Sequence, residues 1–178
     1  METKKPMTEA ALRRFAKAHL DAWNAHDVDA CLALVTDDVL YDDPTFERPA
    51  RGKKEMADRL RSVFAAFPDL HFAEDQFHVH TNVAQSECVV TYTFTGTMTG
   101  ALPAPEGRMP ATGKRVEVSG AALHRFVGEL NSHMIVYYDS LGFMQQLGLL
   151  PESTGLGFKA VVLADLIAGK AKKALHLV

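Results

Sequence analysis

Residues 83–100, VAQSECVVTYTFTGTMTG, decide the fold, because polar and apolar side chains alternate along much of this stretch. An alternation with a period of two is typical of a β-strand, and the many β-branched and aromatic residues favour the same structure. Similar patterns occur on both sides of it, in residues 70–81, 116–127 and 131–139. We therefore predict a sheet built from four strands in this half of the chain.

Three interruptions separate these strands. Residues 101–115 contain three prolines and two glycines, which is typical of a loop. Glu74 and Asp75 break the alternation of the first strand, so we predict a bulge there. A tight turn near Gly128 joins the last two strands.

The chain before the first of these strands has a helical period instead. Apolar side chains recur at helical spacing in residues 8–24 and 53–67, and Asp27 can cap a shorter helix between them. Residues 37–44 predict one more strand, which Pro44 ends. Helices followed by strands indicate the α+β class with an antiparallel sheet. The strands carry apolar or aromatic residues on one parity and Thr, Ser, His or Glu on the other, which favours a curved sheet that wraps the helices and leaves a cavity for some of the polar side chains.

The composition is that of one ordinary globular domain: 178 residues, of which 47% are hydrophobic, with a formal net charge of -3. Such a charge predicts neither a nucleic acid nor a membrane as partner. The N-terminus lacks the apolar run of a secretory signal, so we expect a cytoplasmic protein. Cys31 and Cys88 lie in no metal or redox spacing and are predicted to be reduced, buried thiols.

Asp139 follows the last predicted strand, in the stretch HMIVYYDSLGFMQQLGLLPE (residues 133–152). Two interpretations stay open for its carboxylate. It can cap the helix that begins there, a contribution of about 1 kcal/mol. It can instead lie in an apolar pocket beside Tyr137 and Tyr138, where burial raises the pKa of a carboxyl and makes it an acid/base catalyst.

Other polar and aromatic residues have similar double interpretations. His124 shares the apolar face of its strand, where a histidine is either a core residue or a hydrogen-bonding partner for Asp139. Asp43 is explained by turn chemistry before Pro44, or it faces the mouth of a pocket. Trp23 and Tyr92 either pack in the core or line the cavity.

Two further features predict no additional site. His78 and His80 share one strand face, but no third ligand is close in sequence, so we predict no metal. Residues 152–178 carry an apolar helical stripe, which predicts an amphipathic helical extension that packs on its own domain or on a partner subunit.

Several stretches together resemble the SnoaL-like polyketide cyclases of the nuclear transport factor 2-like superfamily. They include WNAHDVDACLALVTDDVLYDDP (residues 23–44), TFTGTMTGALPA (residues 93–104) and IVYYDSLGFMQQLGLLP (residues 135–151). The resemblance implies a cone-shaped, curved and mostly antiparallel sheet around the N-terminal helices. It implies a SnoaL-like domain over residues 1–151 and a homodimer.

The resemblance also implies a site. A pocket aspartate near the end of the last strand and a histidine from the preceding strand perform acid/base chemistry in such cyclases, and Asp139 and His124 match these positions. Met98 stands where the family often has histidine, and Tyr92 where it often has tryptophan, which leaves the substrate open. The residues expected to bind substrate are Trp23, Tyr41, Asp43, Tyr92, Met98 and Tyr137.

The resulting functional hypothesis is a cofactor-independent enzyme that closes a ring by intramolecular aldol condensation of a hydrophobic, polyketide-like molecule. Confinement in a pocket favours such a reaction through orientation. One alternative is water activation, as in epoxide hydrolases of the same fold, which needs an arginine between two carboxylates. Another alternative is a binding or assembly module without chemistry.

Overall fold

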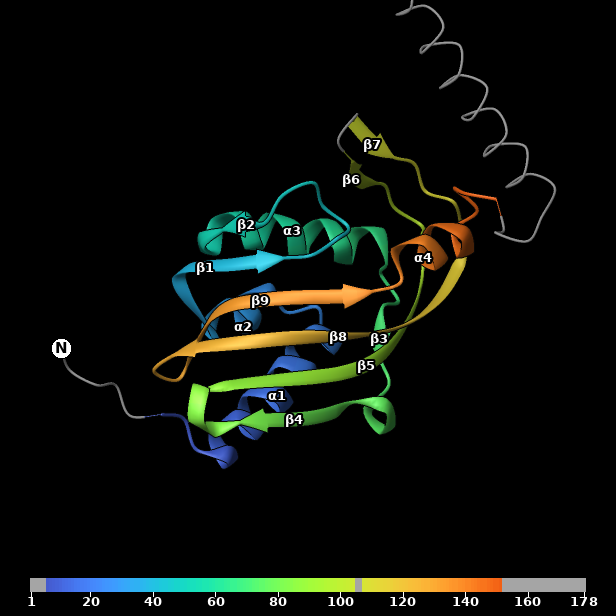
Figure 1. The fold of residues 1–178 in the computed structure, drawn as a ribbon. Coiled ribbons are helices and arrows are strands. Elements are labelled where there is room, and N and C mark those ends of the chain that lie inside the picture. Colours follow the sequence, from blue (N-terminus) through green and yellow to red (C-terminus); the bar gives the residue numbers. More distant parts are fainter. Residues whose placement is uncertain (1–5, 105–106, 152–178) are drawn as a thin grey trace, which may run out of the picture.

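A computed structural model of the chain describes residues 6–104 and 107–151. Up to Ala66 the chain forms helices α1 (Glu9–Asn24), α2 (Val28–Ala33) and α3 (Gly52–Ala66), with strands β1 (Val35–Asp42) and β2 (Ala50–Arg51) between the last two. After Ala66 follow β3 (His71–Phe72), β4 (His78–Asn82), β5 (Glu87–Thr97), β6 (Leu102–Ala104), β7 (Gly107–Met109), β8 (Arg115–Val127), β9 (Leu130–Tyr138) and α4 (Ser140–Gln146). Helices α1 and α3 lie on the same side of the main sheet (Figure 1).

The main sheet has the strand order β2-β1-β9-β8-β5-β3, and β4 pairs with β5 beside β3. β1 runs parallel to β9, and every other pair in this sheet is antiparallel. The register shifts within β1/β9 and within β8/β9, and such irregularities increase the twist of a sheet. The predicted α+β architecture, with helices first and a curved, mostly antiparallel sheet, is confirmed.

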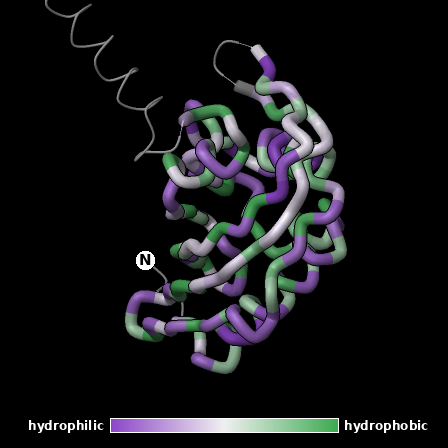
Figure 2. Tube along the Cα trace, turned by 90° about the vertical axis from the view of Figure 1, so that its right-hand side faces the viewer, coloured by the Kyte–Doolittle hydropathy of each residue, from purple (hydrophilic) through white to green (hydrophobic). Residues whose placement is uncertain are grey.

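The core lies between the helices and the concave face of the sheet. Thr8 caps α1 by accepting a hydrogen bond from the Ala11 amide at 3.2 Å, and the helix then buries Leu12, Ala16 and Leu20. Figure 2 shows hydrophobic and hydrophilic residues alternating along the strands, as a sheet with two different faces requires. Cys31 and Cys88 are buried free thiols, as the sequence predicts.

Two local predictions are corrected. A short 3-10 helix, Glu74–Gln76, stands where we expected a bulge, so residues 70–81 form two strands instead of one. Residues 101–115 are not entirely loop, because β6 and β7 form a small hairpin within them. The predicted extension, residues 152–178, lies outside the described residues. The homodimer and the cytoplasmic location stay predictions.

Membrane insertion through a helix has no support in the described part of the chain. None of its helices reaches the length and apolar character that crossing a bilayer requires.

Candidate functional site

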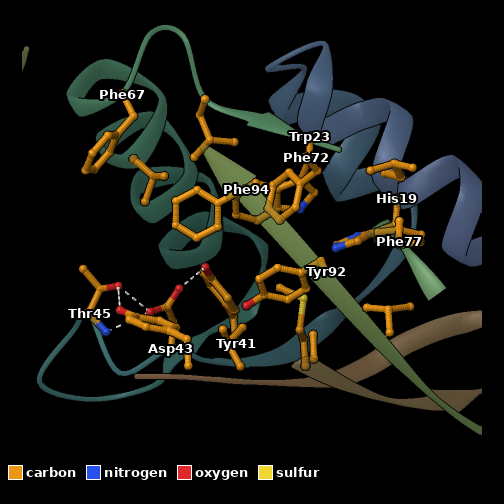
Figure 3. A pocket seen from close by; sticks show the side chains of 18 of the residues that line it. His19, Trp23, Tyr41, Asp43, Thr45, Phe67, Phe72, Phe77, Tyr92 and Phe94 are labelled. Atoms are coloured by element: carbon orange, nitrogen blue, oxygen red, sulfur yellow. Dashed lines mark hydrogen bonds between the residues drawn. The ribbon is translucent and has the colours of Figure 1, made fainter. Parts of the chain in front are cut away.

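A cavity opens between the helices and the concave face of the sheet. Its empty space, together with the open solvent at its mouth, is about 770 Å³, of which the centre of a water-sized molecule can occupy about 80 Å³. Most of the lining is apolar or aromatic. The aromatic side chains of the lining include Trp23, Phe67, Phe72, Phe77, Tyr92 and Phe94 (Figure 3).

One end of the cavity carries a buried carboxylate, Asp43, which is 9% exposed. The Tyr41 hydroxyl donates to Asp43 Oδ2 at 2.6 Å. The Thr45 amide and hydroxyl both donate to Asp43 Oδ1, at 2.8 and 2.6 Å. These three donors come from the end of β1 and the turn after it, and Figure 3 shows them gathered around the carboxylate. These donors fix the position of the carboxylate at the cavity wall.

The chain folds this way locally because an aspartate side chain can bond the backbone amide two residues later. The Thr45 bond to Asp43 has this geometry, and the Phe46 amide donates to the Asp43 carbonyl at 3.0 Å. Turn chemistry therefore uses Oδ1 alone. Oδ2 has only the Tyr41 hydroxyl as a protein donor among the described residues, which leaves it a lone pair for a ligand.

A second hydroxyl extends this network across the cavity. The oxygens of Thr45 and Tyr138 lie 2.6 Å apart. Because the single hydroxyl proton of Thr45 is donated to Asp43, Tyr138 is the donor in this contact. The result is a chain of hydrogen bonds from Tyr138 through Thr45 to Asp43.

The tyrosines of the cavity stay protonated at neutral pH. Burial, reinforced by the Asp43 carboxylate, raises the pKa of Tyr41, Tyr92 and Tyr138 well above the ordinary value of a phenol. They act as hydrogen-bond donors. Tyr41 and Tyr138 already donate to described residues, whereas no described residue bonds the Tyr92 hydroxyl.

Tyr92 reaches this position because β8 carries a glycine beside it. A Cβ atom on Gly120 would lie 2.8 Å from the Tyr92 hydroxyl oxygen and 2.6 Å from the Tyr137 carbonyl oxygen. Any side chain there would displace the phenol ring. Gly120 therefore allows the Tyr92 hydroxyl to lie against the sheet in the cavity wall.

Asp139 is placed differently from our prediction. Its side chain is exposed and does not line the cavity. It caps α4 instead, because Asp139 Oδ1 accepts a hydrogen bond from the Gly142 amide at 2.9 Å. The expectation of a buried carboxylate at the end of β9 is therefore wrong, and the capping interpretation describes its contacts.

Substitutions at Asp139 are expected to affect stability alone. Asp139→Ala removes the cap and should lower the free energy of unfolding by about 1 kcal/mol, whereas Asp139→Asn should change it little because asparagine caps equally well. Urea unfolding of the three proteins measures the difference. A large loss of ligand binding or turnover in Asp139→Asn, with unchanged stability, would contradict this assignment.

His124 is also outside the cavity lining. It is fully buried behind His19, with the two ring centroids 5.0 Å apart. Neither ring nitrogen has a hydrogen-bond partner in the described structure, and the neighbouring Asn131 donates its amide to the carbonyls of Arg125 and His133. The predicted pairing of His124 with Asp139 does not form.

Four of the six expected substrate-binding residues line the cavity, namely Trp23, Tyr41, Asp43 and Tyr92. The other two do not. Met98 is fully buried outside the lining. Tyr137 is 56% exposed, because the inward-facing positions of β9 are Met134, Val136 and Tyr138. A one-residue offset on a strand exchanges its faces, so Tyr138 takes the place we predicted for Tyr137.

Three polar residues of the lining, His19, Thr45 and Tyr138, are not among the residues that we expected to bind substrate. Thr45 was detectable, because an aspartate followed two residues later by threonine is typical of a turn that bonds its own side chain. His19 shares the apolar face of α1 with Leu12 and Trp23, and nothing in that pattern distinguishes it from a core residue.

Comparison with known proteins supports the fold. The family model described as SnoaL-like polyketide cyclase matches residues 13–147. A "putative polyketide cyclase" from Xanthomonas campestris is 20% identical, with a TM-score of 0.67, covering 78% of this chain and 97% of that one. Another with the same description from Pseudomonas putida is 24% identical, with a TM-score of 0.66 and coverages of 79% and 98%.

A third structure shows a small molecule bound within the same fold. This protein from Catenulispora acidiphila has a ketosteroid isomerase-like fold and was crystallised with trimethylamine. It is 19% identical, with a TM-score of 0.61 and coverages of 75% and 92%. No curated protein matches the sequence. The match of the family model over most of the described residues shows that this chain belongs to the SnoaL-like polyketide cyclase family.

Proposed function

We propose that the protein is an enzyme that moves a proton at a carbon atom next to a carbonyl group, in a hydrophobic, polyketide-like molecule. One observation carries the proposal: a single carboxylate, Asp43, lies in an aromatic cavity among hydroxyl donors from Tyr41 and Thr45. Such an arrangement suits a general base that works on a substrate held away from bulk water.

The first step is abstraction of the proton by Asp43. The Tyr41 hydroxyl is the one described donor to Oδ2, so a second lone pair of this oxygen is available to accept the substrate's C–H proton. The electron pair of that C–H bond moves into the carbonyl group, which becomes an enolate. Oδ1 remains fixed by Thr45 and keeps the carboxylate in position.

Tyr92 supplies the complementary interaction. Its hydroxyl lines the cavity near Asp43, stays protonated, and is not bonded by a described residue. It can donate to the substrate oxygen as negative charge develops there. A donor that is already in place stabilises the charged state more than the neutral carbonyl, and such interactions are usually a large part of catalysis.

Ring closure follows when the enolate carbon attacks a second carbonyl group of the same molecule. A carbon–carbon bond forms, and the second carbonyl oxygen takes the proton back from Asp43. The aromatic walls contribute by holding the molecule in a folded shape, because an intramolecular reaction gains chiefly from orientation. If no second carbonyl is within reach and the enolate is conjugated with a carbon–carbon double bond, return of the proton to the far carbon of that conjugated system shifts the double bond, which is an isomerisation.

Water activation of the epoxide-hydrolase type has less support. That chemistry needs two carboxylates bridged by an arginine. Among the described lining residues Asp43 is the only acidic one, and no arginine is present. The arrangement therefore favours proton transfer from carbon.

The test is exchange of ketone protons for deuterium. We would incubate the purified protein in D2O with 1-tetralone and 4-acetylbiphenyl, which are aromatic, largely apolar and carry exchangeable protons beside the carbonyl. Mass spectrometry should show deuterium incorporation well above that in buffer at the same pD. Tight binding of these ketones without exchange would contradict the enzymatic proposal and favour a binding module.

A further inference from the structure

The end of the cavity away from Asp43 carries two polar groups that the proposed reaction does not use. His19 and Trp23 both line it, and Figure 3 shows them away from the Tyr41–Asp43–Thr45 cluster. They are four residues apart on α1, so they share one face of that helix. Their ring centroids lie 5.9 Å apart.

Both side chains are more than nine-tenths buried, with exposures of 9% for His19 and 8% for Trp23. Trp23 Nε1 has no hydrogen-bond partner among the described residues. The His19 ring contacts Phe15, Trp23 and His124 through its faces and edges, and burial alone perturbs its ionisation. A buried indole N–H group nearly always has a partner, so the unpartnered Trp23 Nε1 beside the cavity indicates a partner from the ligand, and the His19 ring lies next to it in the same lining.

We propose that His19 and Trp23 form a second ligand-binding subsite, which hydrogen-bonds an oxygen atom at the end of the ligand distant from Asp43. This inference deepens the proposed function, because it describes the substrate of the same cavity. The substrate is an elongated, largely aromatic ketone with a second oxygen, either hydroxyl or carbonyl, at its far end.

The chemistry of the two side chains limits what the subsite accepts. Burial lowers the pKa of His19 to about 4, so the ring is neutral at pH 7 and has one donor and one acceptor nitrogen. Trp23 Nε1 only donates. A neutral hydroxyl or carbonyl oxygen satisfies both residues, whereas an anion would lack a positive partner, because no lysine or arginine is among the described lining residues.

The experiment compares ligands that differ by one hydroxyl group. The two pairs are 1-tetralone with 6-hydroxy-1-tetralone, and 4-acetylbiphenyl with 4-acetyl-4'-hydroxybiphenyl, which place the hydroxyl at two distances from the ketone. Calorimetry at pH 7 should show tighter binding of the hydroxylated member in at least one pair. We expect a gain of about 3- to 10-fold, the usual value of one hydrogen bond.

Two variants assign that gain to the subsite. His19→Phe keeps an aromatic ring but removes both nitrogens, and should reduce the difference within the pair, because Trp23 Nε1 is then the remaining donor. His19→Gln keeps a donor and an acceptor, and should retain at least part of it. Thermal unfolding of both variants verifies that they fold, and the single tryptophan of the chain, Trp23, gives a fluorescence signal in the subsite itself.

The outcomes separate this inference from the proposed function. A hydroxyl preference that is reduced by His19→Phe and better retained by His19→Gln supports the subsite even if no ketone exchanges its protons. Equal affinity within both pairs, including absence of binding, overturns the subsite even if exchange occurs. A preference that His19→Phe leaves unchanged also overturns it.

Discussion

Asp43→Asn is expected to lower the rate of ketone proton exchange by about 100- to 10,000-fold, the range for loss of a general base. Asparagine cannot accept a proton from carbon at neutral pH. Its side-chain oxygen can still accept from the Thr45 amide, so the turn after β1 should persist. Exchange rates of wild type and variant, measured at equal concentration and pD, test this expectation.

Asp42→Asn is the matched control. Asp42 is the last residue of β1 and lines a shallow depression with Ile135 and Tyr137, outside the main cavity. The same chemical change one residue away should leave the exchange rate within about 2-fold, because Asp42 does not reach the ketone. Equal loss in both variants would mean that the strand end, and not the Asp43 carboxylate, determines the rate.

A binding measurement on the Asp43 variant makes the result more specific. If Asp43 is the base, its variant should still bind 1-tetralone with an affinity close to that of the wild type, since the aromatic walls are unchanged. A normal exchange rate in a folded Asp43→Asn protein would remove the proposed mechanism.

The architecture was predictable because periodicity changes once along the chain. Helical spacing ends near Phe67, and alternation begins soon afterwards, which indicates helices packed on one antiparallel sheet. The hairpin of β6 and β7 was not predictable in this way, because its strands are short and rich in proline and glycine.

The site was harder to predict than the fold, because its residues depend on small offsets. Tyr137 and Tyr138 are chemically alike and adjacent, so only the register of β9 decides which one faces the cavity. The alternation of β9 is imperfect, since Ile135 and Val136 are both apolar. Asp43 and Asp139 likewise both follow strands, and both are explained locally by caps or turns.

Burial distinguishes these two carboxylates, and burial is a property of the assembled fold. The turn after β1 lines the cavity with Asp43 and Thr45, whereas α4 begins where β9 ends and leaves Asp139 in solvent. A resemblance to a family identifies corresponding positions in two chains, but it does not predict in which direction a side chain points. Asp43 was therefore only a secondary candidate from the sequence.

The buried pair His19 and His124 leads to the second large expected effect, a loss of stability in mild acid. Burial lowers the pKa of His19 from 6.5 to about 4, and burial together with the neighbouring His19 lowers the pKa of His124 well below 6.5. The unfolded chain therefore binds protons on both rings at a pH where the folded chain does not. Their contribution to stability is complete above about pH 6.5 and is lost as the pH falls.

The size of the effect follows from the shift of His19. A change from 6.5 to about 4 corresponds to roughly 3 kcal/mol of stability lost by pH 4, and His124 adds to this. Carboxylates contribute mainly at lower pH: Glu55, for example, has its pKa held at about 2 by Arg48 and loses its contribution below about pH 4.5. The interval between pH 6.5 and 4.5 therefore reports chiefly on histidines.

His124→Leu isolates the buried ring from the rest of the protein. Leucine has a similar volume and no polar atom, so the variant should be as stable as the wild type at pH 7, or more stable by up to about 3 kcal/mol, because two unpaired buried nitrogens disappear. Its free energy of unfolding should also fall less between pH 6.5 and 4.5. His78→Gln, which removes an exposed ring, should keep the wild-type dependence.

Urea unfolding at closely spaced pH values measures these slopes, and the double variant His19→Leu/His124→Leu should show the flattest curve. The partly buried His133, whose pKa burial also lowers, remains in every protein and gives a common background. An unchanged slope in the double variant would mean that the two rings take up protons within the folded state. In that case water or a ligand must reach His124 through the cavity, and the dry packing of Phe15, His19 and His124 would not hold in solution.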